Sequence, residues 1–169
     1  LLRVDLPAGP CWYRFSGDGY GEHQDGAPFD GAGRGRPWPL LTGERAHYEL
    51  AAGNVRSAEA LLTALEHFAV DGRLIPEQVW DSNDIPEREL LRGKSSGSAC
   101  PLVWAHAEYI KLRRSLADGA LFDLPPQPFK RYVARKRTAG HFEWRYNNKC
   151  SSIPQGKVLR LVLLSPAKA

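Results

Sequence analysis

The 169-residue sequence contains no methionine, no long apolar run and only three cysteines. No apolar stretch approaches the roughly 18 residues that a membrane-spanning helix needs, and no signal-peptide pattern opens the chain. Cys11, Cys100 and Cys150 share no CxxC spacing, so we interpret them as unpaired small apolar residues that leave the compartment open. Because methionine is absent and Leu1–Val4 has the pattern of the middle of an element, we expect a fragment of a larger protein.

The composition is that of an ordinary globular domain. Hydrophobic residues make up 43% and charged residues 25% of the chain, which has no internal repeats. The net charge is +4, and basic residues gather at 130–131 and 135–137 beside Tyr132 and Phe142. Such a grouping occurs in nucleic-acid-binding proteins, but it is also typical of a solvated face. We favour the solvated face and expect a soluble protein without nucleic-acid or membrane partners. Secretion, the periplasm and other compartments all stay open.

A glycine-rich segment marks the early part of the chain. Seven of the 16 glycines lie between residues 17 and 35, which predicts a long irregular loop with a functional role. Glu22, His23 and Asp25 within it are possible metal ligands. Ligands that are close neighbours on a loop make a poor closed site without a further partner, so we expect no metal and no cofactor.

The apolar periodicity predicts three helices, at residues 37–52, 56–69 and 99–118. Gly53 is expected to stop the first helix, Asn54 to cap the second and Ser98 to cap the third. The first and third helices spread their apolar residues over more than one face, whereas the second has a single stripe. This pattern predicts an inner and an outer helix packed as an antiparallel pair, followed by another inner helix.

The character of the sequence changes beyond residue 120. Prolines break the helical pattern, a short helix is predicted at 129–135, and period-two alternation follows at 141–146 and 157–163. The Pro154–Gly156 turn between the alternating runs predicts a small closing β-hairpin. We therefore expect a domain over residues 1–140 and a hairpin tail over 141–169 packed on the same domain.

The segment Ile75–Asp81, between the second and third predicted helices, has the most chemical character. It presents Glu77, the Gln78 amide, the Trp80 indole and a second carboxylate within five residues. A carboxylate that moves a proton, an amide that holds a hydroxyl and an aromatic face for a sugar ring are the parts of a carbohydrate site. Loop carboxylates are also common as plain solvated residues, so this heptapeptide alone leaves both interpretations open. On periodicity, Trp104 near the start of the third helix is expected in the core.

Longer motifs resemble the bacterial branch of glucoamylases and glucodextranases, family 15 of the glycoside hydrolases. These motifs stand in the family's order and cover nearly the whole chain: DGYGEH (18–23), GRPWPLLTGER (35–45), HYELAAG (47–53), IPEQVWD (75–81), PLVWAHAEY (101–109), PPQ (125–127) and RYVA (131–134). The closing hairpin is similar too. The resemblance implies the C-terminal part of the catalytic domain, which is an all-α fold: a partial (α/α)6 barrel, its last few helices, with a small C-terminal β-hairpin.

The resemblance also implies a hydrolase that acts on α-glucans from the non-reducing end with inversion and releases β-glucose. Glu77 matches the family's general base, Gln78 a residue of the same pocket and Ser98 a serine that hydrogen-bonds the base. Trp104 falls where the family places a tryptophan against the sugar, and this implication replaces the core interpretation. The other substrate-binding candidates are Tyr20, Arg36, Trp38 and Trp80. Asp81 is expected to be structural.

One departure from the family concerns the general acid, a glutamate that lies before the region beginning here. None of Glu22, Glu44, Glu49 and Glu59 stands in a similar motif. We therefore expect a fragment that carries the base, lacks the acid, depends on the missing N-terminal part of the same barrel and is inactive alone. The choice among α-1,4, α-1,6 and trehalose specificity stays open. The alternative is a non-catalytic carbohydrate-binding or interaction module, which would keep the aromatic residues and not depend on Glu77.

Overall fold

The computed structural model of the chain describes residues 2–134 and 141–164. The chain forms two compact units, of which the first ends at Asp123 and the second begins at Leu124. The predicted domain boundary at residue 140 lies outside the described residues and stays a prediction. Among the described residues, no helix combines the length and the apolar character that crossing a membrane requires.

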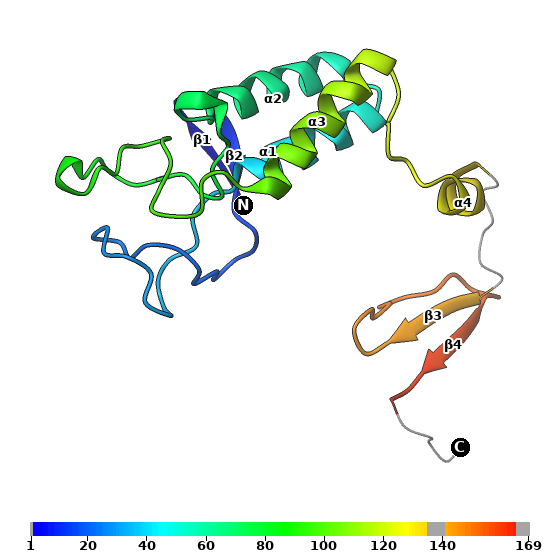
Figure 1. The fold of residues 1–169 in the computed structure, drawn as a ribbon. Helices are drawn as coiled ribbons and strands as arrows, with labels where there is room; N and C mark the ends of the chain where they lie inside the picture. The colour runs from blue at the N-terminus through cyan, green and yellow to red at the C-terminus, as the bar shows by residue number, and fades with distance from the viewer. Residues whose placement is uncertain (1, 135–140, 165–169) are drawn as a thin grey trace. The chain divides into compact units, whose positions relative to one another are not determined.

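The first unit contains three long helices and one β-hairpin (Figure 1). Strands β1 (Arg3–Leu6) and β2 (Gly9–Trp12) precede helices α1 (Pro39–Ala51), α2 (Val55–His67) and α3 (Val103–Asp118). Two 3-10 turns, η1 (Asp71–Arg73) and η2 (Pro86–Arg88), lie between α2 and α3. The three helices lie side by side, and the irregular segments gather at the end where α1 and α3 begin and α2 ends.

The first two helices form where the sequence predicts them. Pro39 occupies the first turn of α1, where its missing N–H costs no intrahelical hydrogen bond. Gly53 adopts a φ of 82° in the turn to α2, which confirms the predicted stop at this glycine. Asn54 precedes α2 as predicted, but its side chain donates to Glu49 Oε2 at 2.8 Å and does not cap the helix.

The apolar faces of the three helices share one core. Leu50 of α1, Leu62 of α2 and Leu112 of α3 belong to a single buried cluster. Burying a leucine side chain stabilises a fold by about 1.5–3 kcal/mol, so this cluster holds the helices together. On α3, however, Val103 and Ile110 are exposed. The second buried face that the sequence predicts for this helix is therefore not present in the described part of the chain.

Helix α3 begins at Val103, so Ser98 is not its cap and that prediction is wrong. The residues before α3 are extended because they pair with residues 75–81. Leu102, for example, donates its N–H to the carbonyl oxygen of Ile75 at 2.9 Å. Pairing with a distant segment has overridden the local helical pattern.

The prediction of an all-α fold, a partial (α/α)6 barrel, is wrong. The described residues combine helices with two two-stranded sheets, so the fold is mixed α/β. In the first sheet, β1 and β2 are antiparallel, and Leu6 pairs with Gly9 across a two-residue turn. These strands are four residues long and carry prolines around the turn, which leaves no alternation long enough to predict a strand from. Leu6 and Cys11 are buried against Ala64 of α2, which anchors the hairpin.

The second unit contains α4 (Pro126–Pro128), the π-helical turn η3 (Phe129–Ala134), β3 (His141–Arg145) and β4 (Val158–Val162). Strands β3 and β4 are parallel, with His141 opposite Val158, so the predicted β-hairpin is also wrong. The connection of 12 residues, 146–157, is long enough to bring the chain back in the same direction, as parallel pairing requires. Residues 135–137, which carry part of the basic run, and residues 165–169 of the predicted tail lie outside the described residues.

Candidate functional site

The segment 75–81 is extended and held by backbone hydrogen bonds on both sides. Glu77 donates its N–H to the carbonyl of Ala99 at 2.8 Å, and Val79 donates to the carbonyl of Pro37 at 3.0 Å. Because its neighbours come from before α1 and before α3, the segment is a central strand-like element at one end of the helices. These hydrogen bonds therefore fix the backbone position from which the side chain of Glu77 extends.

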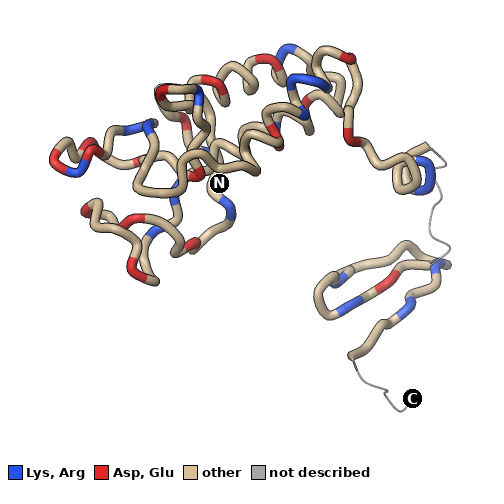
Figure 2. The backbone as a smooth tube through the Cα atoms, viewed as in Figure 1, with Lys and Arg blue, Asp and Glu red and all other residues tan. Residues whose placement is uncertain are grey.

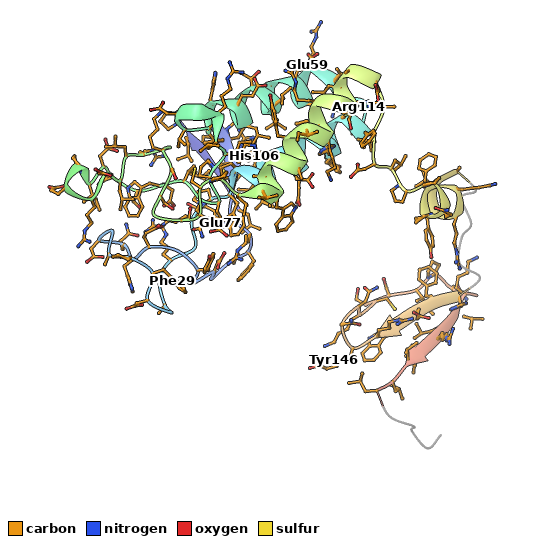
Figure 3. All side chains as sticks on the ribbon, viewed as in Figure 1. Phe29, Glu59, Glu77, His106, Arg114 and Tyr146 are labelled. Atoms are coloured by element: carbon orange, nitrogen blue, oxygen red, sulfur yellow. The ribbon has the colours of Figure 1, made fainter. Side chains whose placement is uncertain are left out.

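This segment forms one wall of a cavity of about 870 Å³. The other walls come from residues 20–29 of the glycine-rich loop and from residues 88–99. Figure 3 shows the loop that carries Phe29 beside the segment that carries Glu77, and Figure 2 shows acidic and basic residues mixed on these stretches. The volume lies in the range of roughly 300–1,000 Å³ that is usual for small-molecule sites.

Four of the eight predicted site residues line this cavity: Tyr20, Glu77, Gln78 and Ser98. Glu77 is 9% exposed, so its carboxylate meets the cavity from a nearly buried position. The hydroxyl of Tyr20 donates a long hydrogen bond of 3.4 Å to Glu77 Oε2. The negative charge of Glu77 is the main cause that raises the pKa of Tyr20, so the phenol remains a donor to the carboxylate.

The side chains of Gln78 and Ser98 organise the backbone of the cavity wall. Ser98 Oγ accepts the N–H of Gln78 at 2.9 Å. Gln78 Oε1 accepts the N–H of Arg36 at 3.2 Å and is almost completely buried. The serine thus contacts the residue that follows Glu77, and the predicted hydrogen bond from Ser98 to the base itself stays a prediction.

Sequence reasoning missed an ion pair beside the cavity, Arg14 with Asp18. Two guanidinium nitrogens of Arg14 bond the two oxygens of Asp18, each at 2.8 Å. This pairing lowers the pKa of Asp18 and raises that of Arg14. The guanidinium also lies 5.0 Å from the ring centre of Tyr20 and 4.8 Å from that of Trp38. The four-residue spacing of the two opposite charges, just before Tyr20, was the available signal.

Arg36 lies beneath the cavity and not on its lining. Its guanidinium is fully buried, donates to Asp81 Oδ1 at 2.6 Å and stacks 3.9 Å from the ring centre of Trp80. The same guanidinium donates to the carbonyls of Glu22 and His23, each at 2.7 Å. In this way one side chain ties the glycine-rich loop to the segment that carries Glu77.

Asp81 is the carboxylate at the centre of this network, which we call the Arg36–Asp81 network. Arg34 Nη2 bonds its Oδ2 at 2.9 Å, and the hydroxyl of Tyr13 donates to the same oxygen. Burial, and second to it the hydrogen bond to Asp81, raises the pKa of Tyr13 to about 12. These contacts fit the structural role expected for Asp81.

The three predicted tryptophans occupy different environments. Trp80 is 0% exposed, and its indole N–H donates to the carbonyl of Asn83 at 2.7 Å. Trp38 is 5% exposed and lies beside Tyr20, with ring centres 6.3 Å apart. Trp104 is 54% exposed on the first turn of α3. Within the described chain, therefore, Trp104 is available to a ligand, Trp38 lies behind Tyr20, and Trp80 supports Arg36.

Two glycines explain why the loop is rich in this residue. A Cβ on Gly35 would lie 2.5 Å from the side chain of Asp18, and one on Gly21 would collide with the carbonyl of Arg34. The two arms of the loop, around residues 18–21 and 34–35, therefore lie too close together for a Cβ at either glycine. Among residues 2–134 and 141–164, no group of three or more His, Cys, Asp and Glu residues stands together as a candidate metal site.

Comparison with known proteins points to one kind of enzyme, although no family model matches the chain. The chain is 47% identical over 134 residues to a glucoamylase of Clostridium sp. (strain G0005), and the match covers 79% of this chain and 18% of that protein. Among solved structures, a bacterial glucoamylase crystallised in complex with acarbose is 46% identical with a TM-score of 0.69, covering 78% of this chain and 18% of that one. The chain thus spans less than a fifth of the length of these relatives. At this level of identity over most of its length, the chain is homologous to a segment of bacterial glucoamylase.

Proposed function

We propose that this chain is the base-carrying segment of an inverting, exo-acting α-glucan hydrolase of family 15 that releases β-glucose. The single observation that carries the proposal is Glu77, a nearly buried carboxylate on the wall of a cavity of about 870 Å³, in a chain homologous to part of a glucoamylase. The N-terminal part of the enzyme, outside this chain, supplies the general acid. The chain alone is expected to be inactive.

In the proposed reaction, Glu77 acts on water and not on the sugar. Its carboxylate takes a proton from a water molecule while the water oxygen attacks the anomeric carbon. The bond from that carbon to the leaving-group oxygen breaks, and the general acid of the missing part protonates this oxygen. In inverting enzymes the two carboxyl groups stand roughly 6.5–9.5 Å apart, which leaves room for the water.

The surroundings of Glu77 support the role of a base. The Tyr20 hydroxyl donates to the carboxylate and contacts Oε2 from the cavity side. Gln78 and Ser98 fix the backbone beside it. Tyr20 and Trp104 offer exposed aromatic surface to a sugar, whereas Arg36, Trp38 and Trp80 act by holding the wall in place.

A hybrid enzyme tests the proposal. In it, this chain replaces the homologous 134-residue segment of the Clostridium glucoamylase. We expect the hybrid to hydrolyse maltose and to release the β-anomer, as followed by proton NMR during the first minutes. Release of the α-anomer would contradict inversion. A folded hybrid that binds acarbose and hydrolyses nothing would favour the alternative, a non-catalytic carbohydrate-binding module.

The isolated 169-residue chain provides the complementary test. If the general acid lies outside it, the chain releases no glucose from maltose or soluble starch at any enzyme concentration. Clear hydrolysis would mean that a carboxylate of this chain is the acid. Glu22 would be the first candidate because it lines the same cavity as Glu77, whereas Glu44 is on the exposed side of α1.

A further inference from the structure

His106 of α3 is bonded to the backbone of the segment that carries Glu77, although it does not line the cavity of Glu77. Its Nε2 lies 3.0 Å from the backbone nitrogen of Ile75. Ile75 is two residues before Glu77, and Figure 3 shows His106 on α3 and Glu77 on the neighbouring loop. The contact therefore joins the helix to the start of the catalytic segment.

The direction of this hydrogen bond determines the state of the imidazole. A backbone N–H only donates, so Nε2 must offer its lone pair, and the ring proton must sit on Nδ1. A doubly protonated imidazole has no lone pair at Nε2 and would place an N–H against the N–H of Ile75. The bond exists only while His106 is neutral.

The bond completes a two-sided clamp on Ile75. The carbonyl of Ile75 accepts the N–H of Leu102 at 2.9 Å, while its N–H donates to His106. The side chain of Ile75 is buried beside Ala105. Only Pro76 separates Ile75 from Glu77, and the ring of a proline fixes its φ. The backbone between the two residues therefore has little freedom, and the position of Ile75 largely determines that of Glu77.

A second cavity, of about 440 Å³, gives His106 access to solvent. The charged and titratable groups that face it are Glu66 of α2, Arg73 of the segment after α2, and Tyr109 and Arg113 of α3. Tyr109 donates to Glu66 Oε1 at 2.9 Å, and Arg113 lies 3.4 Å from the same oxygen. Glu66 is thus occupied by these two partners.

We propose that His106 is a positioning residue for Glu77, which clamps Ile75 in its neutral form and releases it when protonated or replaced. The proposal rests on the proposed function, because positioning matters to catalysis only if Glu77 is the base. Misplacing a reacting group by about 1 Å costs on the order of 100-fold in rate.

Two variants separate the hydrogen bond from the rest of the side chain. His106→Gln places an amide oxygen near the position of Nε2, keeps an acceptor and has no charge at any pH. His106→Leu keeps apolar bulk and removes the acceptor. His67→Gln, at the exposed end of α2, is the matched control for the exchange of histidine by glutamine.

NMR of the full ¹⁵N-labelled chain tests the clamp without reference to activity. We expect Nε2 of His106 to be the unprotonated ring nitrogen that accepts the hydrogen bond from the amide of Ile75. In His106→Gln the amide hydrogen of Ile75 should keep its slow exchange, and in His106→Leu it should exchange at least about tenfold faster. A protonated Nε2 in the neutral ring, or unchanged exchange in His106→Leu, would overturn the proposal.

Kinetics of the hybrid enzyme test the consequence. We expect His106→Leu to lower kcat by on the order of 10- to 100-fold with KM nearly unchanged. His106→Gln, which keeps an acceptor, should retain kcat, and His67→Gln should match the parent. Full kcat in His106→Leu would refute the positioning role even if Glu77 is the base. A hybrid that is inactive with His106 intact would refute the proposed function, while the NMR result would still decide whether the clamp exists.

Discussion

Replacing Asp81 by Asn should destabilise the chain more than its small change in shape suggests. The side chains of Asp81 and Arg36 are 1% and 0% exposed, and they meet at 2.6 Å. The substitution keeps the hydrogen-bonding shape of one oxygen but removes the charge that balances a buried guanidinium. A buried ion pair that loses one partner costs about 3–5 kcal/mol. Because Glu22 Oε2 lies 4.0 Å from Arg36 Nε and supplies a second negative charge, we expect about 3 kcal/mol.

Urea unfolding of the chain measures this effect. Domains of ordinary stability unfold with about 5–15 kcal/mol, so a loss of this size removes a large share of the total. Asp118→Asn is the matched control, because Asp118 pairs with Arg114 on an exposed face at 2.5 Å and such pairs contribute about 0–1 kcal/mol. If Asp81→Asn costs no more than Asp118→Asn, the Arg36–Asp81 network does not hold the loop and the segment together.

Three further perturbations test other parts of the account. Gly9→Ala should cost about 1–3 kcal/mol in urea unfolding, because its Cβ would lie 2.5 Å from Ala64 Cβ. Gly17→Ala, also at positive φ but with nothing within 4 Å, should cost less, and equal losses in the two variants would exclude the clash. The free energy of unfolding should fall as the pH rises from about 9 to about 12. Burial raises the pKa of Cys11 from 9.0 to about 12, so the thiol loses its proton first in the unfolded chain. A flat profile, or the same slope in Cys11→Ala, would contradict this. In the hybrid enzyme, Arg14→Gln should raise KM for maltose at least about tenfold, because a charged donor beside the cavity is lost. Arg3→Gln, in an exposed pair with Asp5, should leave KM unchanged. Equal KM values for the two variants would show that Arg14 does not belong to the site.

The parts of the fold that sequence reasoning predicted are those set by local chemistry. Helices α1 and α2 follow from an uninterrupted apolar period, a proline at the start and a glycine at the turn. The segment 75–81 was singled out as the candidate site in the same way, because Glu77, Gln78 and Trp80 stand together between two predicted helices. These signals depend on residues near one another in the chain.

The parts that it missed depend on contacts between distant residues. The start of α3 moved because residues 95–102 pair with the Glu77 segment, which no local pattern encodes. The β1–β2 hairpin is stabilised by packing on α2, and the parallel direction of β3 and β4 depends on how a 12-residue connection folds. The all-α interpretation came from the family resemblance, and the short β1 and β2 strands offered no local signal against it.

The site shows the same division. The family resemblance placed Arg36 in the site and the aromatic character of Trp80 placed it there too, but only the fold decides whether a guanidinium faces a ligand or stacks on an indole. Arg36 is surrounded by Asp81, Trp80 and two carbonyls, so it stabilises the wall of the cavity. Arg14, which sequence reasoning passed over, is the arginine that lies next to Tyr20.

Glu77→Gln in the hybrid enzyme tests the central claim most directly. The amide keeps the size of the side chain and cannot take a proton from water. We predict that kcat falls by a factor on the order of 10²–10⁴. The dissociation constant of acarbose, measured by titration calorimetry, should stay within about threefold of the parent. Glu59→Gln, on the exposed face of α2 in Figure 3, is the control and should change neither quantity. Turnover within about tenfold of the parent in Glu77→Gln would contradict the assignment of Glu77 as the general base.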